Sequence, residues 1–188
     1  MSDRPITLLS RKEVCRNTVF TVYFDHIRDA AGNEVVDYLS VVPHHQTVSG
    51  VTGVAVLPVL GGTFGLLRVY RHPLGEYGWE VVRGFVDANE TPATAALREL
   101  QEEAGLIATH QSLRELGTLA PESGVLEARV RLFAAEGCTP GSGTPGNEMG
   151  HGEMKYFTRD ALIGMIERSE IMDPCTLVCC YKYLGASS

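Results

Sequence analysis

The sequence GFVDANETPATAALRELQEEAGL, which runs from Gly84 to Leu106, decides the fold of this chain. Thr91 is a good N-cap for a helix, and Pro92 fits the first helical position, where its missing N–H costs nothing. Gly105 suits the left-handed residue that follows a helix. The stretch therefore predicts a loop, a short helix and a tight stop.

Apolar residues recur at helical spacing here and predict one buried stripe, made of Ala93, Ala96, Leu97, Leu100 and Ala104. The opposite side carries Glu99 and Glu103, four residues apart, with Glu102 beside them. Like charges at this spacing cost roughly a few tenths of a kcal/mol each. A cation among the three carboxylates would remove that cost, and hard oxygen ligands suit Mg²⁺ or Mn²⁺. Taken alone, the same glutamates also fit a solvated acidic helix face.

The spacing of the fixed residues favours the metal interpretation. It reads Gly, five residues, Glu, seven residues, then Arg-Glu-apolar-any-Glu-Glu-any-Gly-apolar, ending at Leu106. This pattern is the signature of the Nudix hydrolases, and the chain fills every fixed position. The chain therefore resembles that family, whose members use a divalent metal to cleave nucleoside diphosphates linked to another moiety.

The resemblance implies a fold and a set of roles. The expected fold is α/β, a Nudix-type α/β/α sandwich around a mixed sheet with an N-terminal β extension. Glu99, Glu102 and Glu103 are expected to hold Mg²⁺, with Mn²⁺ as a substitute, and Glu103 is also expected to be catalytic. Four further motif residues are expected to keep the loop-helix-loop in shape: Gly84, Glu90, Arg98 and Gly105.

Composition limits the class of protein. A length of 188 residues favours one domain, and a net charge of −7 argues against a nucleic-acid binder, which would need a basic face. The five cysteines have no zinc-ligand spacing and indicate reduced thiols, so we expect a cytoplasmic protein. No apolar run reaches about 18 residues, so no membrane span is expected.

The N-terminal part is predicted to form a small β unit. Val19–Ile27 and Val35–Val42 are rich in β-branched and aromatic residues and are separated by a turn at residues 30–33. We therefore divide the chain into an N-terminal β extension, residues 1–48, and a Nudix domain, residues 49–188. The resemblance implies that the extension packs across a homodimer, and the alternative is that it packs on its own domain.

The sequence LRVYRHPLGEYGWEVVRGF, residues 67–85, resembles the ADP-ribose pyrophosphatase branch of the family. This resemblance implies that Arg68, Arg71 and Glu80 contact a nucleotide-sugar substrate, since arginine presents a planar fork of donors to phosphate. Solvent-facing arginines are the alternative. Arg83 departs from the branch, which has a small residue there, and it either contacts phosphate or alters which substrate fits.

The segment 137–152 is rich in Gly and Pro and is predicted to be a loop, following a strand over Val125–Ala135. In this family a loop here carries an acidic residue that orients or activates water. Glu148 and Glu153 are the candidates, with a slight preference for Glu153 because it is nearer the next strand, Met154–Phe157. His151 is a further candidate as proton acceptor. Arg159–Arg168 and Cys175–Leu184 are predicted helices.

The expected activity is Mg²⁺-dependent hydrolysis of a nucleoside diphosphate sugar, foremost ADP-ribose to AMP and ribose 5-phosphate. Two alternatives remain open. One is a Nudix hydrolase of another nucleotide derivative, such as a GDP-sugar or NADH, and the other is a nucleotide-binding sensor without turnover.

Overall fold

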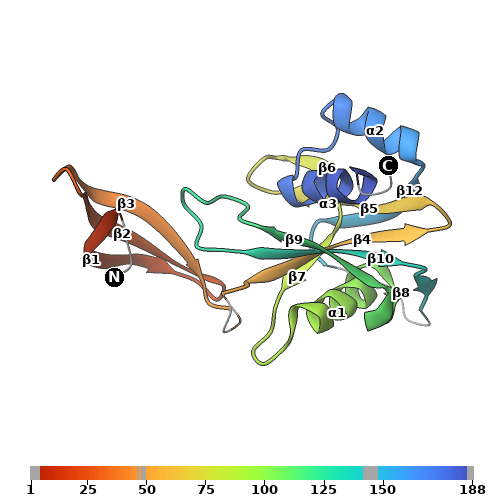
Figure 1. Ribbon diagram of the computed structural model, residues 1–188, viewed down its shortest axis with the longest axis horizontal. Coiled ribbons are helices and arrows are strands. Elements are labelled where there is room, and N and C mark those ends of the chain that lie inside the picture. The colour runs from red at the N-terminus through yellow and green to blue at the C-terminus, as the bar shows by residue number, and fades with distance from the viewer. Residues whose placement is uncertain (1–4, 46, 48–49, 142–147, 186–188) are drawn as a thin grey trace.

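The computed structural model describes residues 5–45, 47, 50–141 and 148–185. Its centre is a seven-stranded sheet in the order β12-β5-β4-β10-β9, with β6 paired to β5 and β7 paired to β4 (Figure 1). The bounds of these strands are β4 Gly53–Leu60, β5 Thr63–Arg71, β6 Glu76–Glu80, β7 Val82–Phe85, β9 Leu113–Leu119, β10 Val130–Glu136 and β12 His151–Phe157. β4 and β10 run parallel and the other pairs are antiparallel, so the sheet is mixed.

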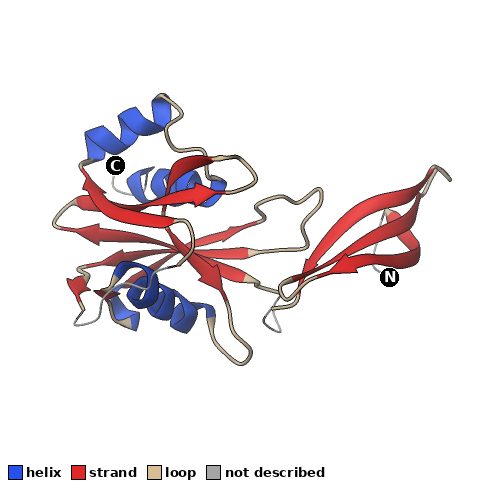
Figure 2. Cartoon of the chain, turned by 180° about the vertical axis from the view of Figure 1, so that it is seen from behind, coloured by secondary structure: helices blue, strands red, loops and turns tan. Residues whose placement is uncertain are grey.

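Helices cover both faces of this sheet. Helix α1, Pro92–Ala104, lies on one face, and α2, Arg159–Glu167, and α3, Pro174–Gly185, lie on the other (Figure 2). Two short strands, β8 Leu106–Ile107 and β11 Thr139–Pro140, pair beside α1, and a 3₁₀ turn, η1, spans His110–Ser112. The predicted α/β/α sandwich is confirmed. The described part of the chain contains no helix with the length and apolar character needed to cross a bilayer.

The core consists of two apolar layers, one on each side of the sheet. β4 supplies both layers, because alternate side chains of a strand face opposite sides. Ala55 and Leu57 pack with the α3 side, whereas Val54 and Val56 pack with the α1 side. This double burial explains why β4 is almost uninterrupted in apolar sequence. Cys179 and Cys180 are buried in α3.

The N-terminal part forms a separate three-stranded antiparallel sheet, β1 Ile6–Arg16, β2 Phe20–Asp29 and β3 Glu34–Pro43. This sheet, which we call the arm, projects from the sandwich without a helix over either face (Figure 1). The prediction of a β unit is confirmed, but β1 was not anticipated because its sequence mixes polar and apolar residues. Within the arm the buried Asp25 carboxylate accepts hydrogen bonds from Arg11 and Ser40.

The arm is joined to the sandwich by a backbone ladder. The Val41 N–H donates to the Val125 carbonyl at 2.8 Å, and the Glu127 N–H donates to the Val41 carbonyl at 2.9 Å. The Tyr38 hydroxyl donates to the Gly124 carbonyl at 2.7 Å. The predicted strand over Val125–Ala135 is therefore wrong in its first part, since Val125 and Glu127 bond to the arm and β10 starts only at Val130.

Candidate active site

Helix α1 is set in place by its two ends. The Thr91 side chain accepts from the Thr94 N–H at 3.1 Å, and Pro92 occupies the first turn. Gly105 is left-handed, with φ of 63°, and its N–H closes the helix onto the Gln101 carbonyl. Both predicted caps are confirmed. The two caps therefore fix where the helix begins and ends.

The side that meets the sheet carries carboxylates. Its buried residues are Ala95, Ala96, Glu99, Leu100 and Glu103. The prediction that the glutamates face away from the apolar stripe is therefore wrong for Glu99 and Glu103, and Ala93 and Leu97 are only half-buried. Burying two carboxylates without a full set of partners is costly. Their burial raises the pKa of the Glu99 carboxyl, although its ion pair with Arg98 opposes this shift.

Arg98 holds the loop before α1 against the helix. Its guanidinium donates to both oxygens of Glu90, to Glu99 at 2.7 Å and to Glu102 at 3.0 Å. It also donates to the Phe85 carbonyl at 2.9 Å, next to Gly84. These bonds keep the pKa of the Glu90 carboxyl below its usual range. The signature arginine thus joins the end of β7, the loop before α1 and α1 itself at one point.

Glu102 lies apart from the other two motif glutamates. Its side chain is 59% exposed and pairs with Arg98 on the outer side of the helix. Among the residues that line the main cavity are Glu99 and Glu103, but not Glu102. The structure therefore brings together two of the three predicted metal ligands and leaves the third at the rim.

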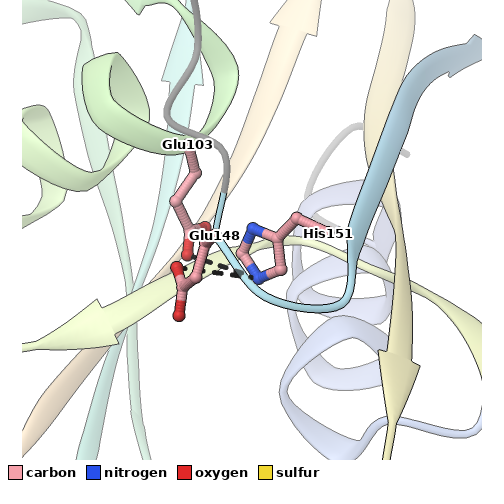
Figure 3. A group of neighbouring side chains, drawn as sticks. All are labelled: Glu103, Glu148 and His151. Carbon is pink, nitrogen blue, oxygen red and sulfur yellow. Dashed lines mark ion pairs between the residues drawn. The ribbon is translucent and has the colours of Figure 1, made fainter.

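Glu103 meets the loop between β11 and β12. Its carboxylate lies beside Glu148 and His151, with ligand atoms of all three within 4.8 Å of one another (Figure 3). His151 Nε2 is 3.8 Å from a carboxylate oxygen of each glutamate. Burial and the neighbouring Glu148 raise the pKa of Glu103 to about 8, even though the Arg83 N–H donates to its carboxylate at 3.1 Å. His151 Nδ1 is buried and has no hydrogen-bond partner in the described part of the chain.

Glu153, the preferred loop candidate, lies elsewhere. Its side chain is 55% exposed and pairs with Lys155 at 2.6 Å. Glu148 is the acidic residue that the chain brings to Glu103, because the first residues of β12 turn the loop back over β5. Distance along the sequence from Met154–Phe157 was therefore a poor guide, since a register irregularity between His151 and Met154 breaks the regular alternation of β12.

The site opens into a cavity of about 420 Å³. Its lining joins Glu99, Glu103, Glu148 and His151 with Arg71 and other residues of the sheet, while Phe20 and Pro43 of the arm close one side. This size lies within the range of about 300–1,000 Å³ that is typical of small-molecule sites. Carboxylates and arginines in one cavity suit an anionic ligand bound through a cation.

The predicted substrate-binding residues fall into two groups. Arg71 lines the cavity and donates to both oxygens of the buried Glu80, one bond being 2.8 Å long. Arg68 is on the opposite face of β5, where it is exposed and lies over the Tyr77 ring at 5.1 Å. Alternation along β5 separates the two arginines, so the predicted pair does not converge on one site.

Arg83 lines the cavity but is already paired. Its guanidinium contacts Glu80 at 3.2 Å and forms a second ion pair with Asp173, just before α3. Asp173 also accepts from the Thr176 N–H and hydroxyl, and the Thr176 oxygen accepts from the Val81 N–H at 3.0 Å. Sequence analysis missed Asp173 and Thr176. Asp-Pro at a helix start was the available signal, but it marks a cap rather than an ion pair.

The residues fit a hard divalent cation. An added Cβ at Gly84 would lie 1.9 Å from the Glu99 carboxylate, so only glycine lets the backbone approach this acid. Glu148 lies close enough to Glu103 to contribute to the raised pKa of Glu103, and a bound cation would relieve that repulsion. Oxygen donors of this kind suit Mg²⁺ and Mn²⁺, and the nearby imidazole favours Mn²⁺ as an alternative.

Comparison with known proteins decides the family. Residues 51–174 match the NUDIX domain. The chain belongs to the Nudix family. It is 30% identical over 166 residues to the ADP-ribose pyrophosphatase of Mycobacterium tuberculosis, covering 87% of this chain and 72% of that protein. It is also 33% identical over 98 residues to a CMP-5'-(N-acetyl-N-hydroxy-3-aminopropyl)phosphonate hydrolase of Streptomyces rubellomurinus, covering 51% of this chain and 46% of that protein.

A solved structure agrees with this fold. A crystal structure of an ADP compounds hydrolase has a TM-score of 0.81 at 19% sequence identity, covering 99% of this chain and 96% of that one. The resemblance to the ADP-ribose pyrophosphatase branch is confirmed by these matches. The Nudix domain and its pyrophosphatase relatives indicate a hydrolase of pyrophosphate bonds, as the sequence predicted.

We expect Gly84→Ala to damage the site while keeping the fold. The new methyl group would displace the Glu99 carboxylate, which is the mobile end of a side chain. Mn²⁺ affinity measured by calorimetry should fall about 10–100-fold, as for other residues that position ligands. Gly185→Ala, where a Cβ meets open space, is the matched control. Unchanged Mn²⁺ affinity in Gly84→Ala would contradict the assignment of Glu99 to the cation.

We expect the chelator-treated protein to lose stability as the pH rises. Folded Glu103 keeps its proton up to a pKa of about 8, whereas the unfolded chain releases it near 4.5. The folded state therefore binds more protons between these values, and its free energy of unfolding falls there by up to about 1.4 kcal/mol per pH unit. Thermal melts from pH 5 to 8.5 should show this fall, and Glu103→Gln should remove most of it. An equal slope in the variant would refute the assignment.

Proposed function

We propose that this chain hydrolyses the diphosphate of a nucleoside diphosphate sugar, with ADP-ribose as the foremost substrate and AMP and ribose 5-phosphate as products. The observation that carries the proposal is that Glu99, Glu103 and Glu148 share one cavity with Arg71. The ADP-ribose pyrophosphatase of Mycobacterium tuberculosis, similar along most of this chain, supports the choice of substrate.

Glu99 and Glu103 are the residues that would hold Mg²⁺ or Mn²⁺, with Glu148 beside them. A bound divalent cation supplies charge neutralisation for the diphosphate and a lowered pKa for water. Glu102 lies at the rim with Arg98, so its contribution is to restrain that arginine or to hold an outer ligand. A raised pKa, like that of Glu103, is expected for a buried carboxylate that lies beside another acid in a cation-binding site.

The chain's own groups would position the two reacting partners. Arg71 is oriented by two hydrogen bonds to Glu80 and is 41% exposed, so its remaining donors are available to a phosphate oxygen. Glu148 is the proposed residue for orienting and deprotonating the attacking water, since it lies beside Glu103. His151 Nε2, 3.8 Å from Glu148, is placed to receive the proton next.

The test is product analysis on ADP-ribose with Mg²⁺, with and without chelator. We expect AMP and ribose 5-phosphate, lost on chelation. Glu103→Gln and Glu148→Gln should lower kcat by at least about 100-fold, because each removes a group needed for the chemical step. Glu153→Gln, on the solvent side, is the matched control and should stay within about twofold.

Two other outcomes would change the conclusion. Turnover of a GDP-sugar, of NADH or of a CMP-linked phosphonate in place of ADP-ribose would support the assignment as a hydrolase but change the assigned substrate. Tight metal-independent binding of nucleotide without turnover of any of these would favour a sensor.

We also propose that the chain is a homodimer joined through the arm. Phe24 and Leu39 form a direct cross-strand pair and are 39% and 41% exposed, and Val36 is 67% exposed. An uncovered sheet with exposed apolar side chains is typical of an interface. The five free cysteines, one of them the exposed Cys15, support the proposed cytoplasmic location.

The dimer predicts a mass near twice the 20.4 kDa of the chain in sedimentation equilibrium. Leu39→Glu should yield monomers, because a desolvated charge would oppose association. Tyr181→Glu changes an exposed apolar residue of α3, outside the arm, and should leave the mass unchanged. A wild-type protein of single-chain mass would overturn the dimer.

A further inference from the structure

The connection between β9 and β10 reaches from the sandwich toward the arm (Figure 1). Three of its residues, Pro121, Leu126 and Ala128, line the main cavity. None of the three side chains carries a charge, so this part of the wall shapes the cavity and does not supply a ligand for a cation. We call residues 121–128 the wall loop. It lies outside the family signature, which ends at Leu106.

The wall loop contributes little to the core that would hold it in place. From Pro121 to Arg129 every side chain is exposed or half-buried. The bonds inside the loop are those of a turn, in which the Leu126 N–H donates to the Glu122 carbonyl at 2.8 Å. Segments with few buried apolar contacts have low local stability. The position of the wall loop therefore depends on its contacts with other elements.

The arm supplies such contacts through the backbone of Val41. The Val41 N–H donates to Val125 and its carbonyl accepts from Glu127, and a parallel bridge aligns Val41 with Leu126. Leu126 lies between the two bonded residues and lines the cavity. The same three residues thus meet the arm along their backbone edge and the cavity through a side chain.

Two side chains of the arm add to this joint. The Tyr38 hydroxyl donates to the Gly124 carbonyl at 2.7 Å. Arg11, which is bonded to Asp25, has its remaining terminal nitrogen 3.9 Å from the Glu127 carboxylate. The Arg11 and Glu127 side chains are 34% and 57% exposed, so this ion pair adds little. Tyr38 is therefore the main side chain of the joint.

The arm also reaches the cavity directly. Phe20 and Pro43 line it, and the Phe20 ring meets the Phe85 ring edge to face, with their centroids 6.0 Å apart. A displacement of the arm would therefore move these side chains and the wall loop together. Glu99 and Glu103 are held on α1, so the same displacement would leave the cation-binding carboxylates in place.

We propose that the arm positions the wall loop and thereby sets the affinity of the main cavity for its substrate, with Tyr38 and Val41 as the positioning residues. The inference rests on the proposed function, which makes this cavity the substrate site. The arm takes no part in the chemical step, because the groups that hold the cation and orient water lie on α1 and just before β12. Loosening the joint should therefore raise KM and leave kcat unchanged.

The first test is Tyr38→Phe, which removes only the hydroxyl that bonds to Gly124. Loss of one such hydrogen bond should raise KM for ADP-ribose about 3–10-fold. Both kcat and the Mn²⁺ affinity from calorimetry should stay within about twofold of wild type, which a general loss of structure would not allow. Tyr23→Phe, on β2 of the arm, is the matched control, because the Tyr23 hydroxyl forms no hydrogen bond within the described part of the chain.

The second test is Val41→Pro, which removes the N–H that donates to Val125. Both backbone groups of Val41 point to the wall loop, so the pairing of β3 with β2 should persist, as it does at Pro43 on the same edge. KM should rise at least about tenfold at unchanged kcat. Amide hydrogen exchange over residues 122–128, followed by mass spectrometry, should be faster than in wild type. Sedimentation should give both variants the mass of wild type.

Three results would overturn the role of the arm. They are an unchanged KM in folded Tyr38→Phe and Val41→Pro, a fall in kcat at unchanged KM, and a rise in KM only where the mass has also changed. Tyr38→Phe alone decides the case if the proline variant does not fold.

Failure of the proposed function looks different. Wild type that binds ADP-ribose in chelator-treated form but releases no AMP with Mg²⁺ would refute the hydrolase. The affinities of the two variants for ADP-ribose, measured by calorimetry, would then decide the role of the arm in place of KM. Wild type that neither binds nor cleaves ADP-ribose would overturn both proposals.

Discussion

Two carboxylates, those of Glu99 and Glu103, lie on the side of α1 that an ordinary amphipathic helix would reserve for apolar residues. Their desolvation is the constraint on which the rest of the site depends. Gly84 lets the backbone approach Glu99, the Arg83 N–H donates to Glu103, and Arg98 neutralises Glu99 from the other side. The sheet and the helix caps therefore keep two carboxylates buried although their desolvation is unfavourable. Such an arrangement is expected of a binding site rather than of a core.

A second set of charged residues differs from the two carboxylates because its members are paired with one another. Arg71, Glu80, Arg83 and Asp173 form a nearly neutral chain of ion pairs, and Thr176 links it by hydrogen bonds to the backbone at Val81. Partly buried ion pairs add little net stability once desolvation is counted, but removing one partner is costly. The network is therefore best understood as fixing the orientation of Arg71 and the distance between the sheet and α3.

The site is assembled from segments that are far apart in the chain. α1 contributes two acids, and the strands β5 and β7 contribute arginines. The loop before β12 contributes Glu148, and the first residue of β12 contributes His151 (Figure 3). The arm closes one side through Phe20 and Pro43, although its sheet is otherwise separate. The site thus depends on how accurately the central sheet positions the ends of its strands next to α1.

The sequence by itself determined the family, the α/β/α fold, both ends of α1 and most strands, because caps, glycines and two-residue alternation are local properties. It could not decide which side of α1 is buried, since helix geometry places Glu99, Leu100 and Glu103 beside one another and only docking on the sheet buries all three. Tertiary structure alone separated Arg68 from Arg71, chose Glu148 over Glu153 as the neighbour of Glu103, and paired Arg83 with Asp173. Each of these depends on contacts between residues distant in sequence, and no local pattern records them.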